Sequence, residues 1–240
     1  MMKLMFDLYR REGLSHAEFV DYYTTVHAPL ASECHPLLSR YAVHPTHPTD
    51  VLFSATSGRE PRPFKCDGVT SWWFRNAEDF NDRKRLFASE DAAKRVEADE
   101  KKCFSRLNGY FVDEVVHWDY ERDWPDRTTS PGIKMIYFVT RKSGLTREEF
   151  RKRYLEHAAV AREHHPGIWR YVQNFVTGNV TQDAPEIDAI AELHFRSEDD
   201  FHNKFYRDDK SPRVIAEDVD RFMVAGDAMA LTTTEMLIVS

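Results

Sequence analysis

The amino-acid sequence contains an internal duplication. Residues 3–23 recur as residues 134–154, with a constant spacing of 131 positions. From His27 onward the spacing is 130. Eight of the fifteen residues from His27 to Tyr41 are identical to their counterparts from His157 to Tyr171, where chance would give about one. Around Phe74 and Phe195 the spacing has fallen to 121. Such a repeat predicts two similar folding units.

A polar stretch with two prolines, residues 121–131, separates the two copies. It has no hydrophobic periodicity, which is typical of a linker. We therefore expect a first domain over residues 1–120 and a second over residues 132–240.

Each copy has the same predicted order of strands and helices. Ser15 and Glu18 have the spacing of a capping box at the start of a helix, and Thr146 and Glu149 repeat it. Hydrophobic patterns in the first copy predict strands over 3–10, 40–44, 68–75 and 109–119, and further helices over 77–86 and 90–104. This order, strand-helix-strand-strand-helix-strand, is that of a ferredoxin-like unit.

These units predict an α+β fold. A four-stranded sheet with helices on one face leaves its other face bare. Two such sheets in one chain can bury their bare faces against each other, which gives an intramolecular dimeric α+β barrel with the helices outside. This internal pairing is also compatible with a homodimer.

The composition excludes several classes of partner. A net charge of −7 argues against a nucleic-acid partner, because phosphate binding needs concentrated Lys and Arg. The sequence has no run of 18 apolar residues, so no membrane-spanning helix is predicted. Charges near the N-terminus leave no apolar signal-peptide core, so the expected location is the cytoplasm. The three cysteines are far apart and predict free thiols. Nucleotide-binding, serine-hydrolase and HExxH motifs do not occur.

An ordered set of motifs, found twice, resembles the EthD family of the dimeric α+β barrel superfamily. The set comprises a strand, Gly-Leu-Ser/Thr, a Phe and a Tyr on the first helix, Val-His-Ala-Pro-Leu-Ala and a later Arg-Tyr. The first copy fits almost throughout, whereas the second has Ala159 and Val160 in place of Pro29 and Leu30.

The resemblance implies an enzyme that holds a small aromatic or polyketide-like substrate between helices and sheet. It further implies proton transfer by His and Tyr without a cofactor. The leading hypothesis is a cofactor-independent lyase or isomerase, of the dehydratase or cyclase type. Two alternatives stay open: a haem- or oxygen-dependent oxidoreductase of aromatic catabolism, and a non-catalytic accessory protein that binds hydrophobic aromatic compounds. The fold alone does not choose among them.

His27 and Tyr23 are the predicted acid–base pair. His27 is expected at the end of the first helix, where carbonyl dipoles favour the imidazolium form. An imidazole that titrates near neutrality beside a tyrosine hydroxyl can move protons on and off a carbon acid. The alternative is a structural role, in which His27 caps the helix and Pro29 ends it.

Polar residues within apolar strands supply two further catalytic candidates, Asp7 and His117. A buried carboxylate must be paired or shift its pKa upward, and a shifted carboxylate is suitable for acid–base work. The predicted substrate-binding residues are Tyr41, His44, Trp72, Phe74, Tyr154 and His157. For each aromatic residue among them, an ordinary place in the core is the alternative.

Strand alternation assigns these side chains to faces. Tyr41 and His44 should point in opposite directions, and so should Trp72 and Trp73. Glu192 and His194 share a face and are expected in a polar layer where the two sheets meet. The histidines form no cluster with ligand spacing, so no metal is expected.

The first copy has nine more residues than the second between its second and third strands. This 45–66 loop is interpreted either as a lid over the pocket or as a neutral insertion.

Overall fold

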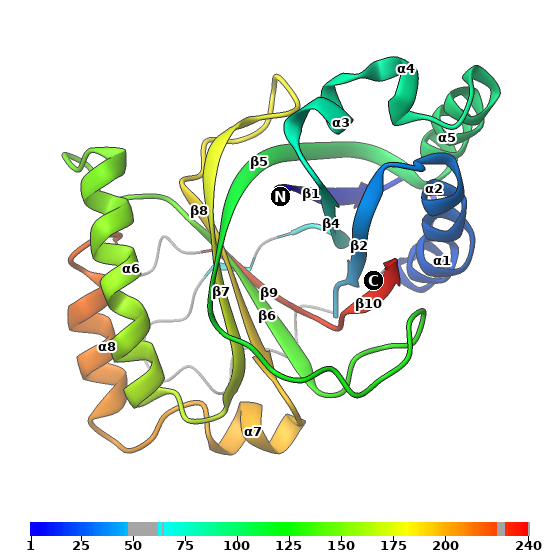
Figure 1. Ribbon diagram of the computed structural model, residues 1–240. Coiled ribbons are helices and arrows are strands. Elements are labelled where there is room, and N and C mark those ends of the chain that lie inside the picture. Colours follow the sequence, from blue (N-terminus) through cyan, green and yellow to red (C-terminus); the bar gives the residue numbers. More distant parts are fainter. Residues whose placement is uncertain (48–61, 64, 225–228, 240) are drawn as a thin grey trace.

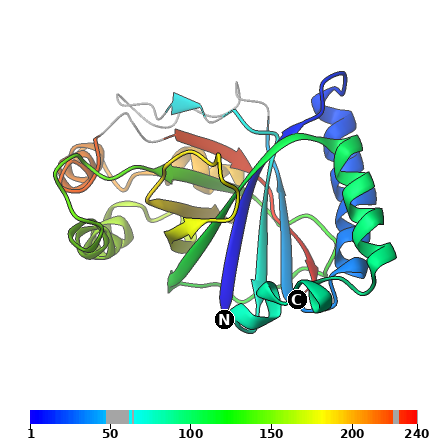
Figure 2. The same ribbon diagram turned by 90° about the horizontal axis from the view of Figure 1, so that it is seen from above.

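The sheet curls into a barrel, with helices on two opposite outer sides (Figure 1; Figure 2). The computed structural model describes residues 1–47, 62–63, 65–224 and 229–239. Within this part of the chain ten strands form one sheet, in the order β10-β2-β4-β1-β5-β7-β8-β6-β9-β3. The predicted α+β barrel of two ferredoxin-like units is confirmed, although its two sheets are joined edge to edge into one. Most of the 45–66 loop lies outside the described residues.

The first repeat supplies β1, β2, β4 and β5 with helices on their outer face. Its elements are β1 (Met2–Arg10), α1 (His16–Tyr22), the π-helical turn η1 (Tyr23–His27), α2 (Ala28–Cys34), β2 (Leu38–Pro45), β3 (Arg62–Pro63), β4 (Gly68–Phe74), α3 (Ala77–Asn81), α4 (Arg83–Leu86), α5 (Glu90–Cys103) and β5 (Phe104–Trp118). Figure 1 shows α1, α2 and α5 together on one side of the barrel.

The second repeat covers the opposite side with α6 and α8 (Figure 1). Its elements are β6 (Ile133–Val139), α6 (Arg147–His164), β7 (Ile168–Asn179), β8 (Ala189–Phe195), α7 (Glu198–Asn203), α8 (Ser211–Val219), β9 (Met229–Thr233) and β10 (Met236–Val239).

Three strand pairings join the repeats in the described part of the chain, and the shortest is that of β3 with β9. The long strand β5 pairs with β1 of its own repeat and also with β7 of the second. At the end of the chain, β9 pairs with β6 of the second repeat, and β10 then crosses to pair with β2 of the first. The barrel is therefore closed by the last strand of the chain.

The predicted local signals are present. Ser15 and Thr146 each cap a helix with the reciprocal glutamate bond of a capping box. Tyr41, Trp72 and Phe74 pack under the helices in the first core, whereas His44 and Trp73 contact polar groups inside the barrel. Strand alternation thus assigned both faces correctly.

The first helix differs from its prediction, because it does not end at His27. It continues through Pro29 to Cys34, and one wide turn lies at Tyr23–His27, where the N–H of Ala28 donates to the carbonyl of Tyr23. The extra residue that changes the repeat spacing from 131 to 130 lies in this turn. In the second repeat α6 runs unbroken from Arg147 to His164. His27 is therefore mid-helix, and the helix-terminus argument for an imidazolium does not apply.

Candidate functional site

His27 forms a buried pair with an aspartate from a neighbouring helix. Its Nδ1 lies 2.9 Å from Oδ2 of Asp99 on α5, and the hydroxyl of Tyr22 donates to Oδ1 of the same carboxylate at 2.5 Å. His27 is 6% exposed. Among the described residues, its Nε2 has no hydrogen-bond partner. Asp99 thus holds the imidazole through Nδ1, and Nε2 is the ring nitrogen that could meet another partner.

The surroundings keep this imidazole neutral. Burial lowers the pKa of His27, and the hydrogen bond and charge of Asp99 oppose that shift. The ring of Phe104 meets the imidazole edge-on at 4.8 Å. The arrangement is a neutral base in an aromatic setting, with a carboxylate placed to stabilise the imidazolium after proton transfer.

The second repeat has a similar pair with different support. His157 Nδ1 lies 2.8 Å from Oδ2 of Asp218, and Arg221 donates to the other carboxylate oxygen at 2.8 Å. The hydrogen bond from His157 lowers the pKa of Asp218, and Arg221 adds to the effect. A cation on Asp218 weakens the stabilisation it can give to a charged imidazole. The first pair differs in that a neutral phenol, that of Tyr22, supports its carboxylate.

Tyr23 is close to His27 but is directed elsewhere. The two rings lie 6.3 Å apart, and the Tyr23 hydroxyl donates to the carbonyl of Val69 at 3.0 Å and bonds Thr70 Oγ1 at 2.5 Å. Its hydroxyl is therefore committed to strand β4. Tyr154, its counterpart, stacks on Phe222 in the second core.

The other two catalytic candidates do not join His27. Asp7 lies in β1 on the face opposite the helices. Its Oδ2 accepts from Asn108 at 2.7 Å, and its Oδ1 has no hydrogen-bond partner in the part of the chain that the structure describes. Burial raises the pKa of Asp7 to about 6. His117 stacks on Tyr171 at 5.2 Å in the second repeat, and the charge of His157 helps to lower its pKa after burial.

The predicted substrate-binding residues divide between three places. Tyr41, Trp72 and Phe74 lie under the helices of the first repeat, and Tyr154 and His157 lie under α6. His44 alone lies inside the barrel. The structure thus brings three of the six together in the repeat that contains His27.

The barrel interior contains an ion cluster with near two-fold symmetry. Lys3 Nζ contacts Glu114 at 2.7 Å, and Lys134, its counterpart, contacts Glu235 at 3.0 Å. Glu192 bridges both lysines, one through each carboxylate oxygen. Burial alone would raise the pKa of Glu192, but the two ammonium groups hold it well below its usual range. The predicted polar layer at the sheet interface therefore exists, with Glu192 at its centre.

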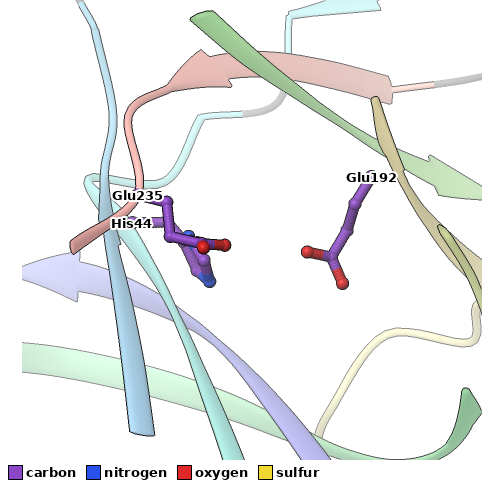
Figure 3. Close-up of side chains that lie close together, drawn as sticks. All are labelled: His44, Glu192 and Glu235. Carbon is purple, nitrogen blue, oxygen red and sulfur yellow. The ribbon is translucent and has the colours of Figure 1, made fainter. Parts of the chain in front are cut away.

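Three of these groups have the spacing of metal ligands. Figure 3 shows His44 and Glu235 facing Glu192 across the interior, and their ligand atoms lie within 4.8 Å of one another. The ammonium of Lys134 contacts all three, at 3.3 Å from His44 Nδ1. A lysine thus supplies the positive charge that a metal would bring. The ligand atoms of His44, Glu192 and Glu235 are suited to a cation, and the ammonium group of Lys134 already contacts all three.

An open hollow of about 420 Å³ lies beside α1. It is lined by His16, Ala17, Val20, Asp21, Thr24, Pro45, Thr46, His47 and Thr234. Thr24 belongs to the same wide turn as His27, so the hollow begins one turn away from the histidine–aspartate pair.

Asp99 and the tyrosine that supports it, Tyr22, were not predicted as site residues from the sequence. Asp99 lies in a helix rich in acidic residues, and nothing local sets it apart. Tyr22 lies beside Tyr23 in the first helix, and its neighbours in the sequence do not mark it as a site residue. The available signal was the recurrence of an aspartate, Asp218, in the last helix of the second repeat.

Comparison of folds finds several solved structures that resemble this chain along nearly its whole length. An anthrone oxidase-like protein matches with a TM-score of 0.59 and 11% identity, over 99% of this chain and 93% of that protein. A Lactobacillus acidophilus protein provisionally assigned as a monooxygenase matches with a TM-score of 0.55 and 11% identity, over 99% and 95% of the two chains. A dye-decolorizing peroxidase from Bacteroides thetaiotaomicron gives 0.51 and 8%, over 96% and 92%. With identities this low, the TM-scores show a shared fold and nothing beyond it.

Sequence comparison is more specific. No curated protein matches the chain in sequence. No helix among the described residues is long and apolar enough to cross a membrane. The EthD domain matches twice, over residues 11–106 and 142–226, which together contain both histidine–aspartate pairs. The chain therefore belongs to the EthD domain family.

Proposed function

We propose that this protein is an enzyme that oxidises an aromatic carbon acid with molecular oxygen, using the His27–Asp99 pair as its base. The observation that carries the proposal is the unpaired Nε2 of His27, held by a buried carboxylate and flanked by aromatic rings. The fold shared with an anthrone oxidase-like protein and with assigned monooxygenases supports oxidation over elimination.

The chemistry balances without a further reductant. His27 Nε2 takes a proton from an acidic CH₂ group between aromatic rings, and Asp99 stabilises the imidazolium. The resulting carbanion, delocalised into the rings, is oxidised by O₂. One oxygen atom becomes the carbonyl oxygen of the product, the other leaves as water with the two hydrogens of the CH₂ group, and the substrate supplies all four electrons.

Anthrone with dissolved oxygen is the test. Oxygen uptake and anthraquinone formation, corrected for the uncatalysed reaction, should fall at least about 100-fold in His27→Asn, the loss typical of a missing general base. The matched variant His157→Asn removes the other histidine and should keep at least half of the activity. Unchanged turnover in His27→Asn, with circular dichroism showing a folded protein, would reject the assignment.

A cofactor-independent lyase or isomerase would begin with the same proton abstraction. Oxygen uptake separates the two reactions, because elimination and isomerisation consume none. Turnover of an aromatic β-hydroxy ketone under anaerobic conditions, with no oxidation of anthrone in air, would establish the lyase function instead.

Haem-dependent oxidation is the second candidate, favoured by the same pairs. A metal-bound histidine characteristically donates its other ring N–H to a carboxylate, and both His27 and His157 do so here. Bound haem would supply redox chemistry with oxygen or peroxide. Phe104 and Phe222, at 4.8 and 5.3 Å from the two imidazoles, occupy the neighbouring space and would have to move. A Soret band on adding haemin, lost in His27→Ala or His157→Ala, would support this candidate.

A further inference from the structure

His35 carries an unused hydrogen-bond acceptor beneath the helices of the first repeat. The residue follows α2 directly and is 3% exposed. Its Nδ1 lies 3.1 Å from the carbonyl oxygen of Leu86. Because a carbonyl only accepts, Nδ1 carries the proton and Nε2 keeps a lone pair. Among the described residues Nε2 has no partner. Burial lowers the pKa of His35 to about 4, so the ring stays neutral at pH 7.

The ring next to His35 has an unused donor. The ring centroids of His35 and Trp72 are 4.8 Å apart, and the buried indole N–H of Trp72 also has no hydrogen-bond partner within the described part of the chain. The Tyr41 hydroxyl is near the indole but outside hydrogen-bond geometry. A buried polar group without a partner costs about 1 to 3 kcal/mol, so a ligand that satisfies both groups gains affinity.

We propose that His35 and Trp72 form a recognition site for a phenolic hydroxyl of the substrate. A hydroxyl is the group that matches one acceptor and one donor, because it donates to His35 Nε2 and accepts from Trp72 N–H. The proposal rests on the proposed function and specifies its substrate class as a hydroxylated aromatic. His27 and His35 are eight residues apart on one helical segment, about 12 Å along its axis, which suits a fused-ring phenol.

The second repeat lacks this site. His165, the counterpart of His35, also holds a carbonyl through Nδ1, that of Phe205 at 2.5 Å. However, the position of Trp72 is taken by Leu193, which has no donor. His165 is therefore the matched control.

The test compares binding of 1-naphthol and 1-methoxynaphthalene, in which a methyl group replaces the hydroxyl proton and removes the donor. It is measured by titration calorimetry in the His27→Asn protein, so that binding is independent of turnover. One net hydrogen bond corresponds to a preference for naphthol of about 2- to 10-fold. His35→Phe should abolish this preference, and His165→Phe should retain it.

A direct readout in the unsubstituted protein covers the case in which His35→Phe fails to fold. The ¹⁵N resonance of His35 Nε2 should move upfield with 1-naphthol and stay in place with its methyl ether. Equal affinity for the two compounds, or a preference unchanged by His35→Phe, would overturn the proposal and indicate that water satisfies His35. Loss of turnover in His27→Asn has no bearing on this result, so the two proposals fail separately.

Discussion

At the scale of single residues, burial and the charged partners within reach together decide the charge state of a polar side chain. Asp7 is an example, because Asn108 donates a hydrogen bond to one of its two carboxylate oxygens. The residue that corresponds to Asp7 in the second repeat is the apolar Phe138. The folded protein therefore binds a proton at Asp7 more tightly than the unfolded chain does.

The free energy of unfolding should therefore depend on pH through Asp7. With the folded pKa raised from 3.8 to about 6, the folded state holds the extra proton between these values, so the contribution of Asp7 to stability falls as pH rises from 4 to 6. Asp7→Asn should remove the dependence and gain about 3 kcal/mol relative to wild type between pH 3.5 and pH 8. Urea unfolding of both proteins across that range measures it. Parallel curves would mean that Asp7 is not buried as an acid.

Much of the placement of single side chains on the faces of the strands could be predicted from the sequence. Alternation predicted that Tyr41 and His44, and likewise Trp72 and Trp73, lie on opposite faces, because a strand has only two faces. The structure then shows that His44 and Trp73 are the interior members. Strand alternation could not predict the contact between His27 and Asp99. That contact depends on how α5 packs on the wide turn that contains His27, more than seventy residues away in the sequence. Tyr23, the predicted partner, is nearer in sequence but bonds the sheet.

At the scale of elements, the wide turn at Tyr23–His27 and the proline after it belong together. In a regular α-helix a proline ring clashes with the carbonyl four residues earlier. The first repeat has both the extra residue and Pro29, and the second has neither, with Ala159 in the regular helix α6. The wide turn is therefore how this helix accommodates its proline.

Deletion of Thr25 tests this coupling. The deletion restores the spacing of the second repeat and forces Pro29 into a regular helix, which should cost about 3 kcal/mol. Combining it with Pro29→Ala should recover most of that loss, as judged by urea unfolding. A single deletion as stable as the wild type, or a combined variant no better than the single one, would separate the proline from the turn.

At the scale of the whole molecule, the two repeats depend on each other. The edge strand β10 of the first sheet comes from the end of the second repeat. Lys3 of the first repeat donates hydrogen bonds to Asn174 and Glu192 of the second. Neither repeat therefore has all of its core within its own sequence. Duplication could be recognised from the sequence, but this exchange of a strand could not, because each copy alone has the right number of strands.

We expect urea to unfold the protein in one transition, with near-ultraviolet and far-ultraviolet circular dichroism coinciding. Leu237 is buried against Ala42 and Trp73, and Leu237→Ala should destabilise the whole molecule by about 2 to 5 kcal/mol. Val239→Ala, at the partly exposed end of the same strand, should cost less. Two separate transitions, or loss of only one repeat in Leu237→Ala, would contradict this interdependence.

The single Glu192 between Lys3 and Lys134 shows what a fused pair of repeats permits. In an assembly of two identical chains every residue near the symmetry axis appears twice, so a carboxylate there would face its own copy. Here the first repeat has Ser71 at the corresponding position, and one negative charge is shared by two amines. Covalent fusion thus allows an odd number of charges at the axis, and the same freedom would allow His27 and His157 to differ in role.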